Sequence, residues 1–353
     1  MDLRLSNKDR KKTSLYLASF ALIILIILAL AISFKNDSAH NKSGTVSAAD
    51  VLINEKNVVK VAKDKDGNIY MEENKLFKKY TIKVSSAIKN INYKQDDNAV
   101  LISFDKDVPL KLNSEINDTN SKYIYMTNDN GKNNLKFKKS YKDNNFVYIN
   151  SGKDSNEIIV LVSKVKKPFT HKAVLNPGHG GIDSGQSVGN LYEKDITLRI
   201  VKLMVSDLQY NGVDVVLTRD KDEGQALADI AAFVNKIQPD VFLSVHINGM
   251  DENPNNYQGI GVYYYDENGY QTNERIKLAN MVLKHATMSD GWKNDGVVRD
   301  KLKVIRLSKA PAVLVETGFL TNDSDRARLQ NDKVLGNLAN NLSQALVEYV
   351  NEK

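Results

Sequence analysis

Two histidines and two glutamates stand where a folded chain could bring them together to bind a metal. His179 lies in "PGHGG" after the apolar run "AVLN", His246 ends the run "DVFLSV", and Glu316 ends "AVLV". Glu193 lies at the N-terminus of an expected helix. Two imidazoles and one carboxylate form a known catalytic zinc set, with a fourth coordination position left for water. The second carboxylate would then remain to act as a base.

The glycines beside His179 indicate a loop that other groups approach closely. Glycine permits turns with positive φ and leaves the backbone unshielded, whereas a buried structural histidine needs packing side chains. Taken alone, His246 could be a hydrogen-bonded core histidine, and Glu193 could be a partner of the helix dipole. Glu316 is harder to explain in that way, because a carboxylate after "AVLV" is costly to bury unless it is paired or bound to a metal. The remaining histidines lack such settings and are expected on the surface: His40, His171 and His285.

Residues 171–353 have the pattern of an α/β domain. Compact apolar strands, "KAVLN", "VDVVLT", "DVFLSVH", "IGVYYY" and "PAVLVET", alternate with helical patterns. One predicted helix stops at Asn211-Gly212, and a terminal helix carries apolar residues from Val334 to Tyr349. This alternation predicts a sheet covered by helices on both faces. Ligands of open α/β sheets bind beyond the carboxyl ends of the strands, so the candidate side chains should converge there.

Residues 51–165 are predicted to form a small β-rich domain. Short runs such as "NAVLISFD" and "NEIIVLVSKV" recur between clusters of Asn, Asp, Lys and Gly, and alternate apolar and polar residues with a period of two. We interpret this domain as a spacer or an envelope-binding module. A boundary is expected near Pro168, and the small polar residues 35–50 are interpreted as a linker.

Residues 14–34 hold no charged side chain and are long enough to cross a bilayer as one helix. Basic residues dominate the preceding residues 1–13, so the positive-inside rule places them in the cytoplasm and the rest of the chain outside the cell. A cleaved signal peptide with a secreted product is the alternative, but the apolar run exceeds the usual length of its hydrophobic region. The chain is therefore expected to be a single-pass membrane protein with an extracellular catalytic domain.

Composition narrows the possible chemistry. The chain has no cysteine, which excludes disulfides, thiolate metal sites and a cysteine nucleophile. Its net charge of +6 lies mostly in residues 51–170. We expect no nucleic-acid partner for an exported protein, so a polyanionic cell envelope or a merely solvated surface explains this excess better.

Several separated motifs, in order, resemble the zinc-dependent N-acetylmuramoyl-L-alanine amidases of bacterial cell walls (type 3 amidase domain). They are "VLNPGHGGIDSG", "LYEKDITL", "VLTRD", "DVFLSVHIN" and "DGVVRDKLKVIRLSKAPAVLVETGFLTN", and they span about residues 171–350. The resemblance implies a mixed, mostly parallel six-stranded sheet flanked by helices. It also implies that His179, Glu193 and His246 are the Zn²⁺ ligands and that Glu316 is the catalytic glutamate. Asn176 departs from the family, which usually has aspartate there.

The resemblance further implies a peptidoglycan hydrolase that cleaves the amide bond between N-acetylmuramic acid and L-alanine, with zinc-activated water and a glutamate general base. The alternative is a wall-binding scaffold of the envelope that is inactive or needs an activating partner. Some relatives carry an occluding helix after the second histidine, but only "GMDENPNNYQ" separates Asn248 from the next strand. We therefore expect an open site. A regulatory envelope protein remains a possible partner, of unknown identity.

Overall fold

The computed structural model describes residues 63–64, 68–104, 108–113, 123–129, 132–153 and 155–352. These belong to one compact unit, Val58–Lys353. The expected membrane helix at 14–34 and the linker at 35–50 lie outside the described residues. None of the helices within the described ranges has the length and apolar character needed to cross a bilayer.

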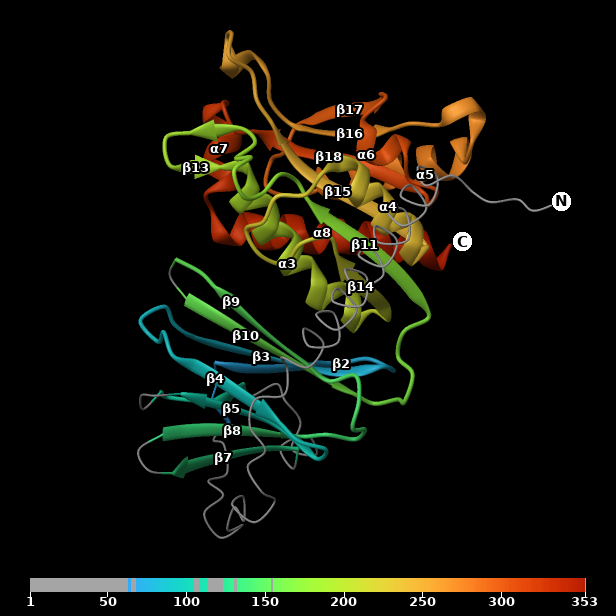
Figure 1. The fold of residues 1–353 in the computed structure, drawn as a ribbon. Helices are drawn as coiled ribbons and strands as arrows, with labels where there is room; N and C mark the ends of the chain where they lie inside the picture. The colour runs from blue at the N-terminus through green and yellow to red at the C-terminus, as the bar shows by residue number, and fades with distance from the viewer. Residues whose placement is uncertain are drawn as a thin grey trace, which may run out of the picture. The chain divides into compact units, whose positions relative to one another are not determined.

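The C-terminal half is built on a mixed six-stranded sheet (Figure 1). Its strands, in spatial order, are β14 (Val213–Leu217), β11 (His171–Pro177), β15 (Val241–Asn248), β18 (Ala312–Phe319), β16 (Ile260–Tyr264) and β17 (Asn294–Arg299). The first four are parallel to one another, whereas β16 runs antiparallel to β18 and β17 runs parallel to β16. The prediction of a mixed, mostly parallel sheet is confirmed. Strand β17 was not predicted as a strand.

Alternate residues of the central strands enter two different hydrophobic cores. In β11, Ala173 and Leu175 pack with α3 (Glu193–Tyr210), α5 (Thr272–Ala286) and α8 (Asp332–Asn351). Val174 packs with α4 (Leu227–Ile237) and α6 (Lys303–Arg306) on the other face. Strands β15 and β18 alternate in the same way, because successive side chains of a strand point to opposite faces. The sheet is thus covered on both faces, as the alternation of strands and helices predicted.

The helices of this half begin and end at recognisable signals. They are α3 (Glu193–Tyr210), α4 (Leu227–Ile237), α5 (Thr272–Ala286), α6 (Lys303–Arg306), α7 (Asp323–Leu329) and α8 (Asp332–Asn351), with short 3₁₀ turns η2 (Pro254–Asn256) and η3 (Glu267–Gly269). Helix α3 ends at Tyr210 and is followed by its C-cap Asn211 and by Gly212 with φ 84°, as expected from the sequence. The side chains of Asn322 and Asn331 cap α7 and α8. A two-residue hairpin, β12 (Ser187–Val188) and β13 (Leu191–Tyr192), leads into α3.

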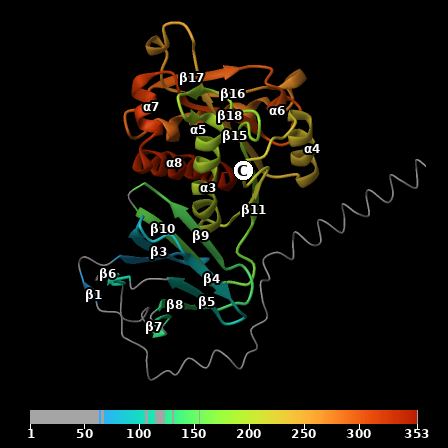
Figure 2. The same cartoon turned by 60° about the vertical axis from the view of Figure 1, so that its left-hand side comes forward.

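The described residues before 164 form two β-sheets, which Figure 2 shows from a second side. One contains β1 (Lys63–Asp64), β6 (Leu112–Asn113), β2 (Ile69–Glu73), β3 (Phe77–Ser85), β10 (Ser155–Ser163) and β9 (Phe146–Ser151). The other contains β4 (Ile91–Gln95), β5 (Ala99–Phe104), β8 (Lys132–Lys138) and β7 (Ile124–Asp129). Inward side chains of both sheets, among them Ile82 and Ile158 from the first and Ile102 and Phe137 from the second, share one core. The pairing is mainly antiparallel, as predicted for a β-rich region.

Candidate metal centre

His179 lies in a tight loop just beyond the carboxyl end of β11. Its φ of 59° is in the left-handed region, and Gly180 and Gly181 follow with φ of 136° and 61°. Such a run of positive φ needs glycine at its flexible positions, because a side chain there is strained. The loop turns back on itself through a bridge between Gly180 and Asp183. The expectation that the glycines around His179 serve a sharp turn is therefore confirmed at Gly180 and Gly181.

His246 and Glu316 lie directly beside each other on neighbouring strands. They are paired residues of the parallel strands β15 and β18. Both side chains are near the carboxyl ends of these strands, at the same edge of the sheet as the loop after β11. Gly178 leaves room for the His246 ring, because a Cβ at that glycine would lie 2.5 Å from Cε1 and 2.6 Å from Nδ1 of the imidazole.

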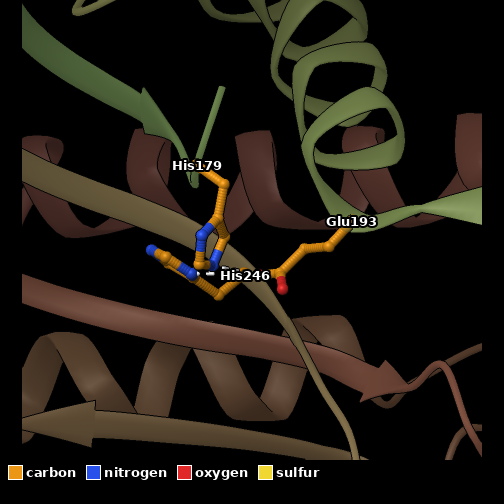
Figure 3. Close-up of side chains that lie close together, drawn as sticks. All are labelled: His179, Glu193 and His246. Atoms are coloured by element: carbon orange, nitrogen blue, oxygen red, sulfur yellow. Dashed lines mark hydrogen bonds and ion pairs between the residues drawn. The ribbon is translucent and has the colours of Figure 1, made fainter. Parts of the chain in front are cut away.

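Glu193 is the first residue of α3 and joins the two histidines (Figure 3). Its Oε1 lies 3.0 Å from His246 Nδ1 and 3.2 Å from His179 Nε2. The backbone N–H of Ile247 also donates to Oε1, and that of Gln186 donates to Oε2. The glutamate side chain is only 3% exposed. A buried carboxylate in this setting is a positioned ligand and more than a partner of the helix dipole.

One nitrogen of each histidine and one oxygen of Glu193 lie within 4.8 Å of one another. Burial by itself would raise the pKa of Glu193, but the hydrogen bonds with His179 and His246 outweigh it and lower that pKa to about 2. The Glu193 hydrogen bond raises the pKa of His179 to about 9, against the effect of burial. Two imidazole nitrogens and one ionised carboxylate suit zinc and similar divalent transition metals. His179, Glu193 and His246 therefore form a metal-binding triad.

Asp183 orients the first histidine. Its Oδ2 lies 2.8 Å from His179 Nδ1, and its Oδ1 accepts a hydrogen bond from the backbone N–H of Gly185. With Nδ1 facing this carboxylate, Nε2 is the nitrogen that faces Glu193. Carboxylates in this position fix the tautomer of metal-binding histidines. Asp183 was not predicted from the sequence, although its position four residues after His179 in a glycine-rich loop was a usable signal.

Glu316 contributes a buried carboxyl oxygen for which the described residues offer no donor. Its Oε2 is buried and has no hydrogen-bond partner within the described part of the chain. Burial is the largest cause that raises its pKa to about 8, and the nearby charge of Glu193 adds to it. Structures rarely leave a buried carboxyl oxygen unpaired, so such an atom calls for a functional explanation.

Asn176, the departure from the family pattern, forms its hydrogen bonds away from the triad. Its amide donates to Thr218 Oγ1 at 2.8 Å, and its Oδ1 accepts from Ser244 Oγ at 2.7 Å. It links β11 to β15 and to the residue after β14. Of the other histidines, His171 is partly exposed, whereas His285 is only 13% exposed and bonds Glu348, so the surface expectation was wrong for His285.

The segment between β15 and β16 contains only the 3₁₀ turn η2, as the short sequence there predicted. Asn255 holds this segment on the start of α7: its Oδ1 accepts from the backbone N–H of Asp323, and its Nδ2 donates to Asp323 Oδ2. Gly259 N donates to the buried carboxylate of Asp325 at 2.7 Å. Residues 249–259 are therefore tied to α7 and contain no α-helix.

Comparison with known proteins agrees with this geometry. Residues 173–348 match the family model described as N-acetylmuramoyl-L-alanine amidase. The chain is 33% identical over 171 residues to the N-acetylmuramoyl-L-alanine amidase LytC of Bacillus subtilis, covering 48% of this chain and 34% of LytC. It is 35% identical over 183 residues to the endolysin of Bacillus phage SPP1, covering 51% of this chain and 66% of the endolysin. The chain thus spans only about a third of LytC and just under two thirds of the endolysin.

Among solved structures, an N-acetylmuramoyl-L-alanine amidase from Clostridium difficile 630 is 32% identical, with a TM-score of 0.49. The match covers 52% of this chain and 98% of that one.

Proposed function

Because residues 173–348 are a domain of the N-acetylmuramoyl-L-alanine amidase family, we propose that this protein is a peptidoglycan hydrolase. It cleaves the amide bond between N-acetylmuramic acid and the L-alanine of the stem peptide. The observation that carries the proposal is the convergence of His179, Glu193 and His246 beside Glu316, whose buried Oε2 has no hydrogen-bond partner among the described residues. The complete ligand set favours an active enzyme over an inactive wall-binding scaffold.

We propose zinc as the metal, because two imidazoles and one carboxylate match its usual catalytic ligands. Bound there, zinc would lower the pKa of a water molecule to near neutrality, and its positive charge would stabilise the substrate carbonyl oxygen. The chain's own contribution is to hold three ligand atoms in place. Asp183 fixes the His179 ring, the Ile247 and Gln186 amides fix the Glu193 carboxylate, and strand β15 fixes His246.

Glu316 is proposed as the general acid–base group. Its carboxylate takes a proton from the attacking water and returns it to the nitrogen of the departing L-alanine, since an amine leaves only when protonated. Without a metal the pKa of Glu316 is about 8, and a zinc ion beside it would lower that pKa toward the working pH, where proton transfer is most effective. Its Oε2 accepts no hydrogen bond from the described part of the chain and is therefore available to take this proton.

The test is product analysis with the full chain. The purified protein is incubated with purified peptidoglycan, with and without zinc, beside Glu316→Gln, and the fragments are identified by mass spectrometry. The proposal predicts zinc-dependent release of intact stem peptides with a free L-alanine amine, without an added partner, and no release by the variant. A strict need for an activating partner would contradict the expectation of an open site. Fragments cut within the stem peptide would indicate a different zinc hydrolase.

We also propose that residues 14–34 anchor the protein in the cell membrane with the catalytic residues outside. The support is the uncharged apolar run and the basic residues before it. Protease added to intact cells should then degrade the catalytic segment. Protection of this segment from the protease would indicate the opposite orientation in the membrane. Recovery of a shortened, soluble form from the medium would instead favour a cleaved signal peptide.

Residues 51–165 are proposed to bind the envelope or to set the distance of the catalytic domain from the membrane. Deletion of this range and sedimentation with purified wall separates the two roles. Loss of wall binding indicates a binding module, and unchanged binding indicates a spacer.

A further inference from the structure

One fully buried cation lies behind the metal centre. Arg219 follows β14 in the sequence and is only 2% exposed. Burial lowers its pKa, against the attraction of Asp222, Asp195 and Glu223, yet a guanidinium titrates so far above neutrality that it remains charged at any physiological pH. A buried charge is costly unless its donors are satisfied, so the partners of this side chain indicate its role.

Four backbone carbonyls accept from this side chain: three lie in the two segments that carry His179 and Glu193, and the fourth is that of Lys221, two residues away. Nε donates to Pro177 O at 3.1 Å, and Nη2 donates to Gly178 O at 2.7 Å, in the two residues that precede His179. Nη2 also donates to Lys194 O at 2.9 Å, in the residue that follows Glu193. One guanidinium therefore joins the histidine loop to the first turn of α3, from which the two ligands extend toward each other (Figure 3).

Two further contacts connect this group to the third ligand and to α3. Gly178, whose carbonyl Arg219 binds, donates its N–H to Val245 O, and its Cα faces the ring of His246. The Thr197 hydroxyl of α3 donates to the same Gly178 carbonyl at 3.0 Å. The peptide at Gly178 is thus held between α3, β15 and Arg219.

We infer that Arg219 is a positioning residue of the metal centre, which clamps the His179 loop to the start of α3 so that the triad is preformed before zinc binds. The planar guanidinium is suited to this role, because its donors diverge in a fixed fork and reach several carbonyls at once. Lysine presents a single ammonium on a flexible stem and cannot make the same set of bonds. This inference rests on the proposed metal site, but its test does not require amidase activity.

The chain offers a matched control. Arg275 on α5 is 1% exposed and donates to four backbone carbonyls, those of Tyr265, Ile305, Ser308 and Ala310. None of these residues is part of the metal centre. Its replacement removes the same kind of buried clamp from another part of the fold.

The experiment compares Arg219→Lys and Arg275→Lys in the full chain. Zinc affinity is measured by competition with a fluorescent chelator, and thermal unfolding is measured in the presence of chelator. We expect Arg219→Lys to weaken zinc binding about 10- to 100-fold, the range typical of groups that orient ligands. Arg275→Lys should lower the unfolding temperature and leave zinc affinity unchanged.

Equal zinc affinity of folded Arg219→Lys and wild type would overturn the inference, as would an equal loss in both variants. If wild type itself binds no zinc, the proposed metal site fails instead.

If Arg219→Lys does not fold, Thr197→Val tests the same inference. This variant removes the second donor to Gly178 O from a fully buried position. Its control is Ser343→Ala, which removes a buried hydroxyl that donates to Ala339 O in α8. Only the Thr197 variant should then bind zinc more weakly.

Discussion

Replacement of Gly178 by alanine should damage the metal site while sparing most of the fold. A Cβ at this position would lie 2.5, 2.6 and 2.9 Å from three atoms of the His246 ring. Gly178 has no positive φ, so alanine meets no backbone strain there. The three atoms nearest to the added Cβ all belong to a metal ligand, so the clash falls first on His246.

The size of the effect follows from these distances. Relief of the clash to an ordinary contact of about 3.5 Å requires a shift of about 1 Å in the ring or in the loop. Metal–ligand distances tolerate only about 0.2 Å, so the displaced nitrogen can no longer complete the site. We expect zinc affinity to fall at least about 100-fold, beyond the range for changes that leave the ligands themselves in place. Overpacking should lower the free energy of unfolding by about 1 to 3 kcal/mol.

The assay is chelator competition for zinc, combined with thermal unfolding in excess chelator so that loss of metal and loss of packing are separated. Gly336→Ala is the control, because this glycine lies within α8 and an added Cβ meets nothing within 4 Å. That variant should bind zinc normally and gain about 0.5 to 1 kcal/mol of stability, since alanine favours the helix. Zinc binding by Gly178→Ala at wild-type strength would refute the assignment of His246 as a ligand positioned by this contact.

Three further outcomes are expected. Because the pKa of Glu316 is about 8 in the folded protein, against 4.5 for an ordinary glutamate, the folded state holds a proton there that the unfolded chain has lost. The free energy of unfolding in chelator should thus fall as pH rises from about 4.5 to about 8, and Glu316→Gln should remove part of that fall; parallel pH profiles would contradict this. Asp183→Asn should weaken zinc binding about 10-fold in the same competition assay, and no change would show that the Asp183 carboxylate does not orient His179. Phe137→Ala, in the fully buried core of the β-sheets, should cost about 3 to 5 kcal/mol in denaturant unfolding without changing zinc affinity.

The strands that hold the metal centre could be predicted because they are buried on both faces. Runs such as "VFLSV" and "AVLV" are mostly or wholly apolar, and His246 and Glu316 stand out directly after them as charged or polar residues. Strand β17 escaped prediction for the opposite reason. It lies at the edge of the sheet, and its sequence "NDGVVR" is mostly exposed, so it has too few apolar residues to show a period.

The ligand atoms and their supports could not be predicted from sequence. His179 faces Glu193 with Nε2 whereas His246 does so with Nδ1, a difference that depends on ring orientations set by Asp183 and by the packing of Gly178. Arg219 was visible in the motif "VLTRD", but its partners beside the metal ligands are 25, 41 and 42 residues away. Contacts of this range exist only once the sheet and α3 have assembled.

The three ligands come from a loop after β11, from the first residue of α3 and from β15, the strand that separates β11 from β18. An unfolded chain therefore offers only scattered donors, and zinc under the proposed function binds the native state almost exclusively. A ligand of this kind stabilises the native state in proportion to the logarithm of its free concentration, by about 2.7 kcal/mol at one hundred times its dissociation constant. The supply of zinc would then set both the rate of catalysis and the resistance of the protein to proteolysis. Depletion of zinc would inactivate the hydrolase and also lead to its degradation.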